Sequence, residues 1–293
     1  MIFRAKNLSV RYPRKKEDAL SNISLQINEG EIIGLVGHNG AGKTTLLKII
    51  CNLLLPSNYD EYYFNKRVQT SLITNSDQLY NNLTVLENIQ FTFALYKKKF
   101  NEVVVEDYLI KTNLLNFKNE KIGNLSTGQK QKVNIVKALS VGSNFLILDE
   151  PTSGLDPIAR YEFHQLISSV VQDEKITVIF CSHIISEVEK ICSRIIMLNS
   201  GSIVRDKAIN ELFSEFPEYV IEIETKPRSS KIDDFLSNIH GENYIEKEVM
   251  GKSYFLIKDE YIDIDEIQKI RLDSFVKRKT SLEDIYMFIN SGG

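Results

Sequence analysis

The chain contains no tryptophan, six prolines and three cysteines among its 293 residues. Cys51, Cys181 and Cys192 are odd in number and lack paired metal-ligand or redox spacing, which fits a reducing cytosol. The chain also has little net charge, −3 at pH 7, because 36 basic residues face 39 acidic ones. This balance gives no electrostatic reason to expect a nucleic acid as a partner.

Long apolar runs are missing as well. The longest ones, such as 145–148 and 176–180, have the length of a strand and are far too short to cross a bilayer. Residues 1–12 alternate like a strand and do not form the apolar block of a signal peptide. We therefore expect a chain that is soluble by itself and that works at a membrane only through a partner.

A glycine-rich segment directly follows the apolar strand pattern at 31–36, and a helical pattern of apolar residues follows it. The segment reads Gly37-His38-Asn39-Gly40-Ala41-Gly42-Lys43-Thr44. Its glycines let the backbone wrap around a polyphosphate, which then faces backbone N–H groups and a helix N-terminus. Lys43 can reach the β- and γ-phosphates, and the Thr44 hydroxyl can ligate Mg²⁺. A glycine turn with a chance lysine is the alternative, but the flanking strand and helix favour a nucleoside triphosphate site.

A second strand pattern, 145–149, ends in two carboxylates, Asp149 and Glu150. Strands of a parallel sheet deliver their last residues to the edge where nucleotides bind in α/β folds. Asp149 is placed to hold Mg²⁺ and Glu150 to polarise an attacking water, since both tasks need hard oxygen atoms. Acidic pairs at strand ends are common without function, but the upstream phosphate loop makes this pair a candidate site.

The rest of the chain predicts two domains, because 293 residues with 43% hydrophobic content can bury more than one core. Residues 83–117 read as helical and charged, and short apolar runs at 144–148 and 177–180 flank a helix at 156–173, which indicates a parallel sheet. The sequence pattern changes after about residue 212. Strand and helix patterns follow one another there in a βαββαβ-like order over about eighty residues, which predicts a ferredoxin-like module. Its strands are expected near 219–225, 244–249, 253–258 and 274–279, its helices near 232–239 and 263–272, and a last helix at 281–290.

Further segments make the chain resemble the ATP-binding cassette (ABC) ATPases over about residues 1–210. Leu125-Ser126-Thr127-Gly128-Gln129 resembles their signature sequence, and Ser153-Gly154-Leu155-Asp156 resembles the loop after their acidic strand. His183 resembles their switch histidine, and Tyr12 resembles the aromatic residue that stacks on adenine. The resemblance implies an α/β P-loop cassette at 1–211, with an antiparallel β subdomain, a parallel-sheet core and a helical subdomain at about 83–140, followed by a small α+β domain at 212–293.

The resemblance also implies an ATPase that needs Mg²⁺, with Glu150 and His183 as its catalytic pair. A lone histidine after a strand is more often a packed or surface residue, but its place after 177–181 favours the γ-phosphate role. Two cassettes would dimerise head to tail, so that the signature and Asp156 of one chain complete the site of the other. The residues expected to bind ATP are Tyr12, Gly37, Asn39, Gly40, Ala41, Gly42, Lys43, Thr44 and Thr45, and those expected to hold the metal are Thr44, Asp149 and Asn75.

Two positions depart from the family pattern. Thr127 stands where the commonest signature has glycine, which is tolerable only if its φ is negative. Asn75 aligns with the glutamine that contacts Mg²⁺ and the membrane partner, and Gln78 is the runner-up. Asparagine keeps the amide group but is one methylene shorter than glutamine.

The coupled process is expected to be transport. The span between phosphate loop and signature is too short for the coiled coil of chromosome and repair ATPases, and translation factors carry two cassettes. The mixed α/β tail, with the segment 279–286 at its end, resembles that of bacterial export ATPases for peptides, toxins, drugs or lipids. Separately encoded membrane subunits would then hold the cassette at the cytoplasmic face of the cell membrane. An import ATPase and a nucleotide-gated regulatory protein remain alternatives.

The membrane subunits are expected to dock in a groove between Asn75 and the helical stretch that begins near Leu83. A short cytoplasmic helix of the partner would insert there. The alternative is that Leu79, Tyr80, Leu83 and Phe91 simply pack within the helical subdomain, and the sequence favours neither interpretation.

Overall fold

The structure is a computed structural model that describes residues 1–74, 79–225, 230–239, 241–249, 252–261, 270 and 272–291. The chain divides into two compact units, Met1–Asp206 and Lys207–Gly293. The sequence predicted a boundary after residue 211, five residues later than this division. The predicted boundary falls inside the short helix α7 (Ile209–Ser214), which belongs wholly to the second unit.

A mainly parallel sheet forms the centre of the first unit, as predicted. Its strand order is β5-β6-β7-β3-β8-β9. Every residue of β3 and β7 is buried, as are the first four of β6, which explains why these strands read as unbroken apolar runs. The strands are β3 (Ile32–Val36), β5 (Thr70–Thr74), β6 (Phe145–Asp149), β7 (Thr177–Cys181), β8 (Arg194–Asn199) and β9 (Ser202–Ala208).

A second sheet of the first unit is antiparallel and has the order β2-β1-β4. Its strands are β1 (Phe3–Val10), β2 (Leu20–Ile27) and β4 (Glu61–Phe64). In β2 buried residues largely alternate with less buried ones, as expected for a strand with one face on a core. Helix α1 (Lys43–Ile50) shares one apolar cluster with both sheets, so the start of this helix is fixed where the two sheets meet.

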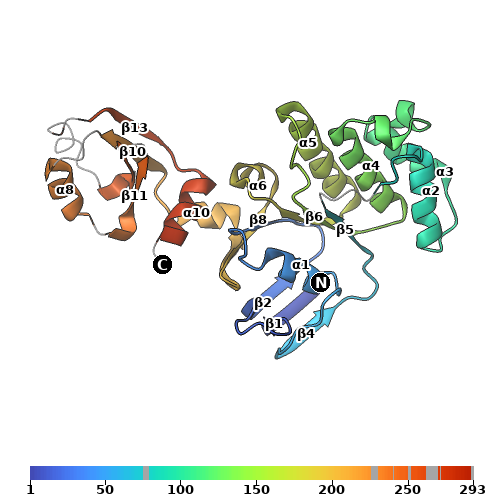
Figure 1. Ribbon diagram of the computed structural model, residues 1–293, viewed down its shortest axis with the longest axis horizontal. Coiled ribbons are helices and arrows are strands. Elements are labelled where there is room, and N and C mark those ends of the chain that lie inside the picture. Colours follow the sequence, from blue (N-terminus) through green and yellow to red (C-terminus); the bar gives the residue numbers. More distant parts are fainter. Residues whose placement is uncertain are drawn as a thin grey trace. The chain divides into compact units, whose positions relative to one another are not determined.

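Helices form the rest of the first unit, and Figure 1 shows α2, α3 and α4 grouped together beyond β5. They have an apolar core of their own, to which Val85, Val105 and Val133 belong. Among the helices in the described part of the chain, none combines the length and apolarity needed to span a bilayer. The helices are α2 (Val85–Leu95), α3 (Glu102–Lys111), α4 (Thr127–Ser140), α5 (Pro157–Glu174) and α6 (Ile185–Ile191).

The second unit contains an antiparallel sheet in the order β11-β12-β10-β13. Its first and third strands pair at the centre, as in a split βαβ arrangement. The predicted helix near 263–272 lies largely outside the described residues. The elements are α7, β10 (Tyr219–Thr225), α8 (Ser230–Ser237), β11 (Tyr244–Val249), β12 (Lys252–Lys258), β13 (Ser274–Lys279) and α10 (Leu282–Ser291).

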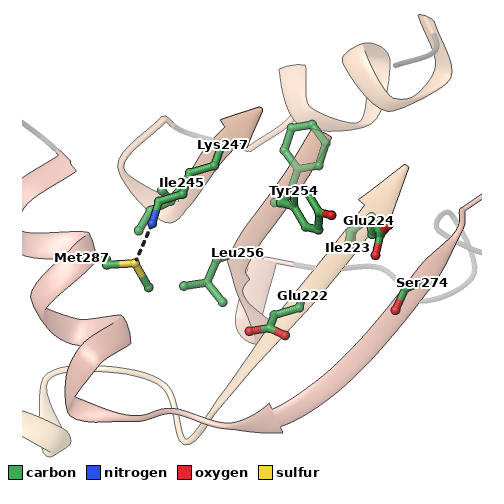
Figure 2. Close-up of a pocket in the computed structure, with 10 residues that line it drawn as sticks. Glu222, Ile223, Glu224, Ile245, Lys247, Tyr254, Leu256, Ser274 and Met287 are labelled. Carbon is green, nitrogen blue, oxygen red and sulfur yellow. Dashed lines mark hydrogen bonds between the residues drawn. The ribbon is translucent and has the colours of Figure 1, made fainter. Parts of the chain in front are cut away.

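One face of this sheet bears a hollow beside α10, with a volume of about 380 Å³ (Figure 2). Glu222, Tyr254 and Leu256 line it from the sheet, and Met287 lines it from the helix. The Lys247 ammonium lies 3.3 Å from the Met287 sulfur across the hollow. Ile221 and Phe255 belong to the apolar core of the unit, where they cluster with residues of α8.

Candidate nucleotide site

The glycine-rich segment forms a tight loop between β3 and α1. A Cβ atom on Gly37 would lie 2.4 Å from the carbonyl oxygen of Leu198, so only glycine allows this approach to β8. Gly42, the residue directly before α1, has φ +104°, and a Cβ there would lie 2.8 Å from the carbonyl oxygen of Ala19. Both positions therefore require glycine for steric reasons, since any side chain there would collide with the neighbouring backbone.

A cavity of about 380 Å³ lies above this loop, and it brings the loop together with the acidic end of β6. The Lys43 ammonium donates to the carbonyl oxygens of Gly37 at 2.6 Å and His38 at 3.1 Å, which keeps its charge over the loop. Ala41, predicted to bind ATP, is only 1% exposed and supports the loop from the core side. The cavity is lined by Ala19, Asn39, Gly40, Gly42, Lys43, Thr44, Thr45, Asp149 and Glu150.

The predicted adenine-stacking residue, Tyr12, follows the end of β1. Its hydroxyl lies 3.3 Å from Oγ1 of Thr45 on α1. This contact anchors the phenol beside the start of the helix that carries Lys43 and Thr44. The structure thus places Tyr12 next to the phosphate loop, although the two are some thirty residues apart in the sequence.

Asp149 and Glu150 stand at the end of β6, next to the end of β7. Asp149 is in register with Cys181, and the Glu150 backbone N–H donates to the Cys181 carbonyl at 2.9 Å. Glu150 has φ +54°, a left-handed conformation that costs a non-glycine residue about 1–2 kcal/mol. Its Oε2 atom lies 2.5 Å from Nδ1 of His183. The predicted catalytic pair is therefore in direct contact.

The chemistry that this cavity can support follows from the polar groups that line it. Thr44 offers a hydroxyl and Asp149 a carboxylate, and such hard oxygen atoms suit Mg²⁺, which binds few protein ligands and fills its shell with water and phosphate. Lys43 and the loop N–H groups attract phosphate, while Glu150 offers a carboxylate that can orient water. This set suits phosphoryl transfer to water.

The signature residues lie away from this cavity, at the start of α4. Ser126 caps the helix: its hydroxyl accepts from the Gln129 N–H at 3.2 Å, and the Gln129 side chain accepts from the Ser126 N–H at 2.9 Å. Thr127 is the first helical residue, so its φ is negative, as its presence here requires. A Cβ on Gly128 would lie 3.1 Å from Cβ of Ala159, which shows how closely α4 approaches α5. Leu125 is buried in the helical core.

The predicted interface residue Asp156 has a structural partner within its own chain. Its carboxylate accepts from the N–H groups of Ile158 and Ala159, both at 2.9 Å, and so caps α5. Asn75 and Gln78, the two candidates for the residue that contacts Mg²⁺ and the membrane partner, lie outside the described residues.

The sequence alone did not point to Glu187, a buried carboxylate on α6 that contacts the loops after β6 and β7. The one available signal was its position in the first turn of the helix that follows His183. A glutamate there reads as a solvated helix residue, because nothing nearby in the sequence reveals its partners.

Known proteins resemble this chain in sequence. The sequence profile described as "ABC transporter" matches residues 20–153. The ABC transporter ATP-binding protein NatA of Bacillus subtilis is 33% identical over 70% of this chain and 89% of its own length. The methionine import protein MetN of Carboxydothermus hydrogenoformans is 30% identical, covering 71% and 66%. The bacitracin transport protein BcrA of Bacillus licheniformis is 28% identical, covering 75% and 74%.

Solved structures give the same result for the fold. CbiO1 from Clostridium perfringens, part of the ABC transporter complex CbiONQ, superposes with a TM-score of 0.66 at 27% identity over 73% of this chain and 91% of its own. The ATP-binding cassette MJ0796, as a dimer in a post-hydrolysis state bound to ADP and phosphate, superposes with a TM-score of 0.60 at 26% identity, covering 71% and 99%. The shared part is thus a nucleotide-binding cassette.

Proposed function

Because this chain belongs to the ABC transporter family of ATP-binding cassettes, which hydrolyse ATP, we propose that it is the ATPase subunit of an exporter with separately encoded membrane subunits. The observation that carries the ATPase role is the single cavity that joins Lys43 and Thr44 to Asp149 and Glu150. The relatives include a methionine import protein and a bacitracin transport protein, so the direction rests on the second unit. Its small α+β fold resembles the tail of bacterial export ATPases.

In the proposed site the phosphate loop binds the triphosphate. Lys43 exchanges the carbonyl oxygens of Gly37 and His38 for phosphate oxygens, and the Tyr12 ring stacks on the adenine. Thr44 and Asp149 hold Mg²⁺, with Asn75 as the further ligand expected from the sequence. When bound, Mg²⁺ neutralises charge on the β- and γ-phosphates. Lys43, Thr44 and Asp149, which support these phosphate and metal roles, line one cavity.

Glu150 and His183 act on the terminal phosphate in this proposal. Glu150 orients the attacking water, and the contact at 2.5 Å between Oε2 and His183 Nδ1 fixes the carboxylate. The His183 side chain is 61% exposed, which leaves its other nitrogen accessible to a γ-phosphate. Hydrolysis then removes the group on which both residues act.

A second cassette completes the site. The N-terminus of α4, with Leu125, Ser126, Thr127, Gly128 and Gln129, would approach the γ-phosphate bound to the other chain, and Asp156 would lie at the interface. Backbone N–H groups at a helix start favour an anion. The dimeric state of the similar cassette MJ0796 supports this arrangement.

The membrane subunits are proposed to dock at a groove of about 240 Å³ between β5, α2 and α4. Leu79 is buried in the helical core, so the packing alternative applies to it. Tyr80 and Phe91 instead remain 53% and 38% exposed, with ring centroids 4.9 Å apart. Neither residue is among those that line the groove in the described part of the chain, but exposed aromatic side chains suit contact with a partner helix, which would hold the cassette at the cytoplasmic face of the membrane.

Steady-state ATP hydrolysis, measured for the chain alone and with its membrane subunits in lipid vesicles, tests the proposed role. We expect turnover that rises with the membrane subunits, whereas a nucleotide-gated regulatory protein would bind ATP without turnover. The direction is tested in cells with radiolabelled methionine uptake and with bacitracin resistance, the transport named for two relatives. Methionine accumulation that depends on Glu150 would contradict export.

A further inference from the structure

Glu187 joins the two loops that carry Glu150 and His183. Its Oε2 atom accepts a hydrogen bond from Oγ1 of Thr152 at 2.7 Å and another from Oγ of Ser182 at 3.1 Å. Thr152 lies two residues after Glu150, and Ser182 directly precedes His183. One carboxylate oxygen thus spans the end of β6 and the end of β7.

The Glu187 carboxylate is buried, with its side chain 3% exposed, and two basic residues of α5 face it. Arg160 Nε lies 2.9 Å from Oε1, and His164 Nε2 lies 3.9 Å from Oε2. Burial raises the pKa of Glu187, but the contacts with His164, Thr152 and Ser182 lower it by more, so its pKa lies below the ordinary value. The group is therefore ionised at neutral pH and accepts from both hydroxyls.

The simplest alternative is that Glu187 only stabilises the core through an ion pair. Glu174 does so elsewhere in the unit, where its carboxylate accepts from Tyr108 at 2.5 Å and from Lys111 at 3.0 Å and links α3 to the end of α5. Glu187 differs because its hydrogen bonds go to the residues that flank the Glu150–His183 contact. A residue that served only in a core ion pair would not need one oxygen atom to accept hydrogen bonds from both Thr152 and Ser182.

We infer that Glu187 is a positioning residue for ATP hydrolysis, which holds the Glu150 and His183 loops at a fixed separation through Thr152 and Ser182. The inference rests on the proposed roles of Glu150 and His183. Glu150 occupies a left-handed backbone conformation, which persists only where its surroundings hold it, and the bond from Thr152 is one such restraint. A small shift of either loop would lengthen the 2.5 Å contact and misplace the attacking water.

The test compares kcat with KM for ATP. Glu187→Gln keeps the size of the side chain and weakens both hydrogen bonds, and Thr152→Val removes one of them without changing volume much. For both we expect kcat to fall about tenfold and KM to stay within about twofold, because binding is untouched. Thr152→Ser keeps the hydroxyl and should retain most of the turnover. Glu174→Gln is the matched control, with kcat unchanged.

A double variant separates positioning from stability. In single-turnover measurements Glu150→Gln with Glu187→Gln should be no slower than Glu150→Gln alone, since a residue that acts through Glu150 loses its effect with it. Additive losses would overturn the inference, as would full turnover of both Glu187→Gln and Thr152→Val well below their unfolding midpoints. If Glu150→Gln itself hydrolyses at the wild-type rate, the proposed role of Glu150 fails, and the inference fails with it.

Discussion

Oε2 of Glu150 lies 2.5 Å from Nδ1 of His183, although the two residues are 33 positions apart. The parallel pairing of β6 and β7 creates this contact, because it brings the carboxyl ends of both strands to one edge of the sheet. Each residue follows its strand by one or two positions.

Replacing the carboxylate of Glu150 should separate binding from turnover. Glu150→Gln keeps the shape and a donor for His183 but cannot orient water as an anion, so we expect ATP hydrolysis to fall at least a hundredfold. Equilibrium binding of ATP and dimer formation should persist. Glu162→Gln, which breaks only an exposed ion pair with Lys132, should hydrolyse normally. Wild-type hydrolysis by Glu150→Gln would refute the assignment.

Removing the ammonium of Lys43 should instead weaken the binding of ATP. A charge-assisted contact contributes about 1.5–3 kcal/mol, so Lys43→Ala should raise the Kd for MgATP by roughly ten- to a hundredfold in titration calorimetry. Lys48→Ala is the matched control, since this exposed lysine lies on the same helix, at its other end. Equal Kd values for both variants would contradict the phosphate role of Lys43.

Two glycines of the loop should respond differently to the same methyl group. Gly42→Ala would place Cβ 2.8 Å from the Ala19 carbonyl oxygen at φ +104°, whereas Gly40→Ala has open space at φ +87°. We expect Gly40→Ala to lower the unfolding free energy by about 1–2 kcal/mol, from backbone strain alone. Gly42→Ala should lose more stability and also bind ATP poorly. Denaturant unfolding checks the order, which an equal loss would contradict.

The second unit should lose stability in acid through Asp284. This carboxylate is 1% exposed and accepts from Arg278 and Ser281. Burial raises its pKa, but the contacts with Arg278 and Ser281 lower it by more. Its stabilisation is therefore complete above the pKa of the unfolded chain, about 3.9, and is lost as the pH falls through the lower folded value.

Asp284→Asn should accordingly destabilise the second unit by roughly 2–4 kcal/mol at pH 7 and flatten the pH dependence of its unfolding. Glu283→Gln, at the exposed neighbouring position, is the control and should change little. Thermal unfolding of the full chain between pH 3 and 7 provides the measurement. An unchanged pH dependence in Asp284→Asn would show that another group is responsible.

Short sequence patterns predicted those parts of the fold that depend on residues close together in the chain. The phosphate loop was predictable because its glycines and Lys43 are contiguous, and the parallel sheet because β6 and β7 read as short unbroken apolar runs on either side of a helix. The helix expected at 156–173 is α5 at Pro157–Glu174. In the second unit β11 and β13 have the expected bounds.

Contacts between distant elements were harder to predict. The network of Glu187 depends on where α5 and α6 pack, which no short sequence pattern encodes. The left-handed conformation of Glu150 is likewise set by its bond to the Cys181 carbonyl on the neighbouring strand. Asp156 was expected only at an interface, and its capping of α5 became visible only in the fold.

The bonds from Lys43 to the Gly37 and His38 carbonyls have a consequence for the energetics of nucleotide entry. Since the ammonium is already tethered over the loop, an arriving triphosphate replaces one set of oxygen atoms with another and has no long, freely rotating side chain to immobilise. Much of the conformational entropy of the Lys43 side chain is therefore lost during folding. The free energy of nucleotide binding then depends mainly on the exchange of carbonyl oxygens for phosphate oxygens.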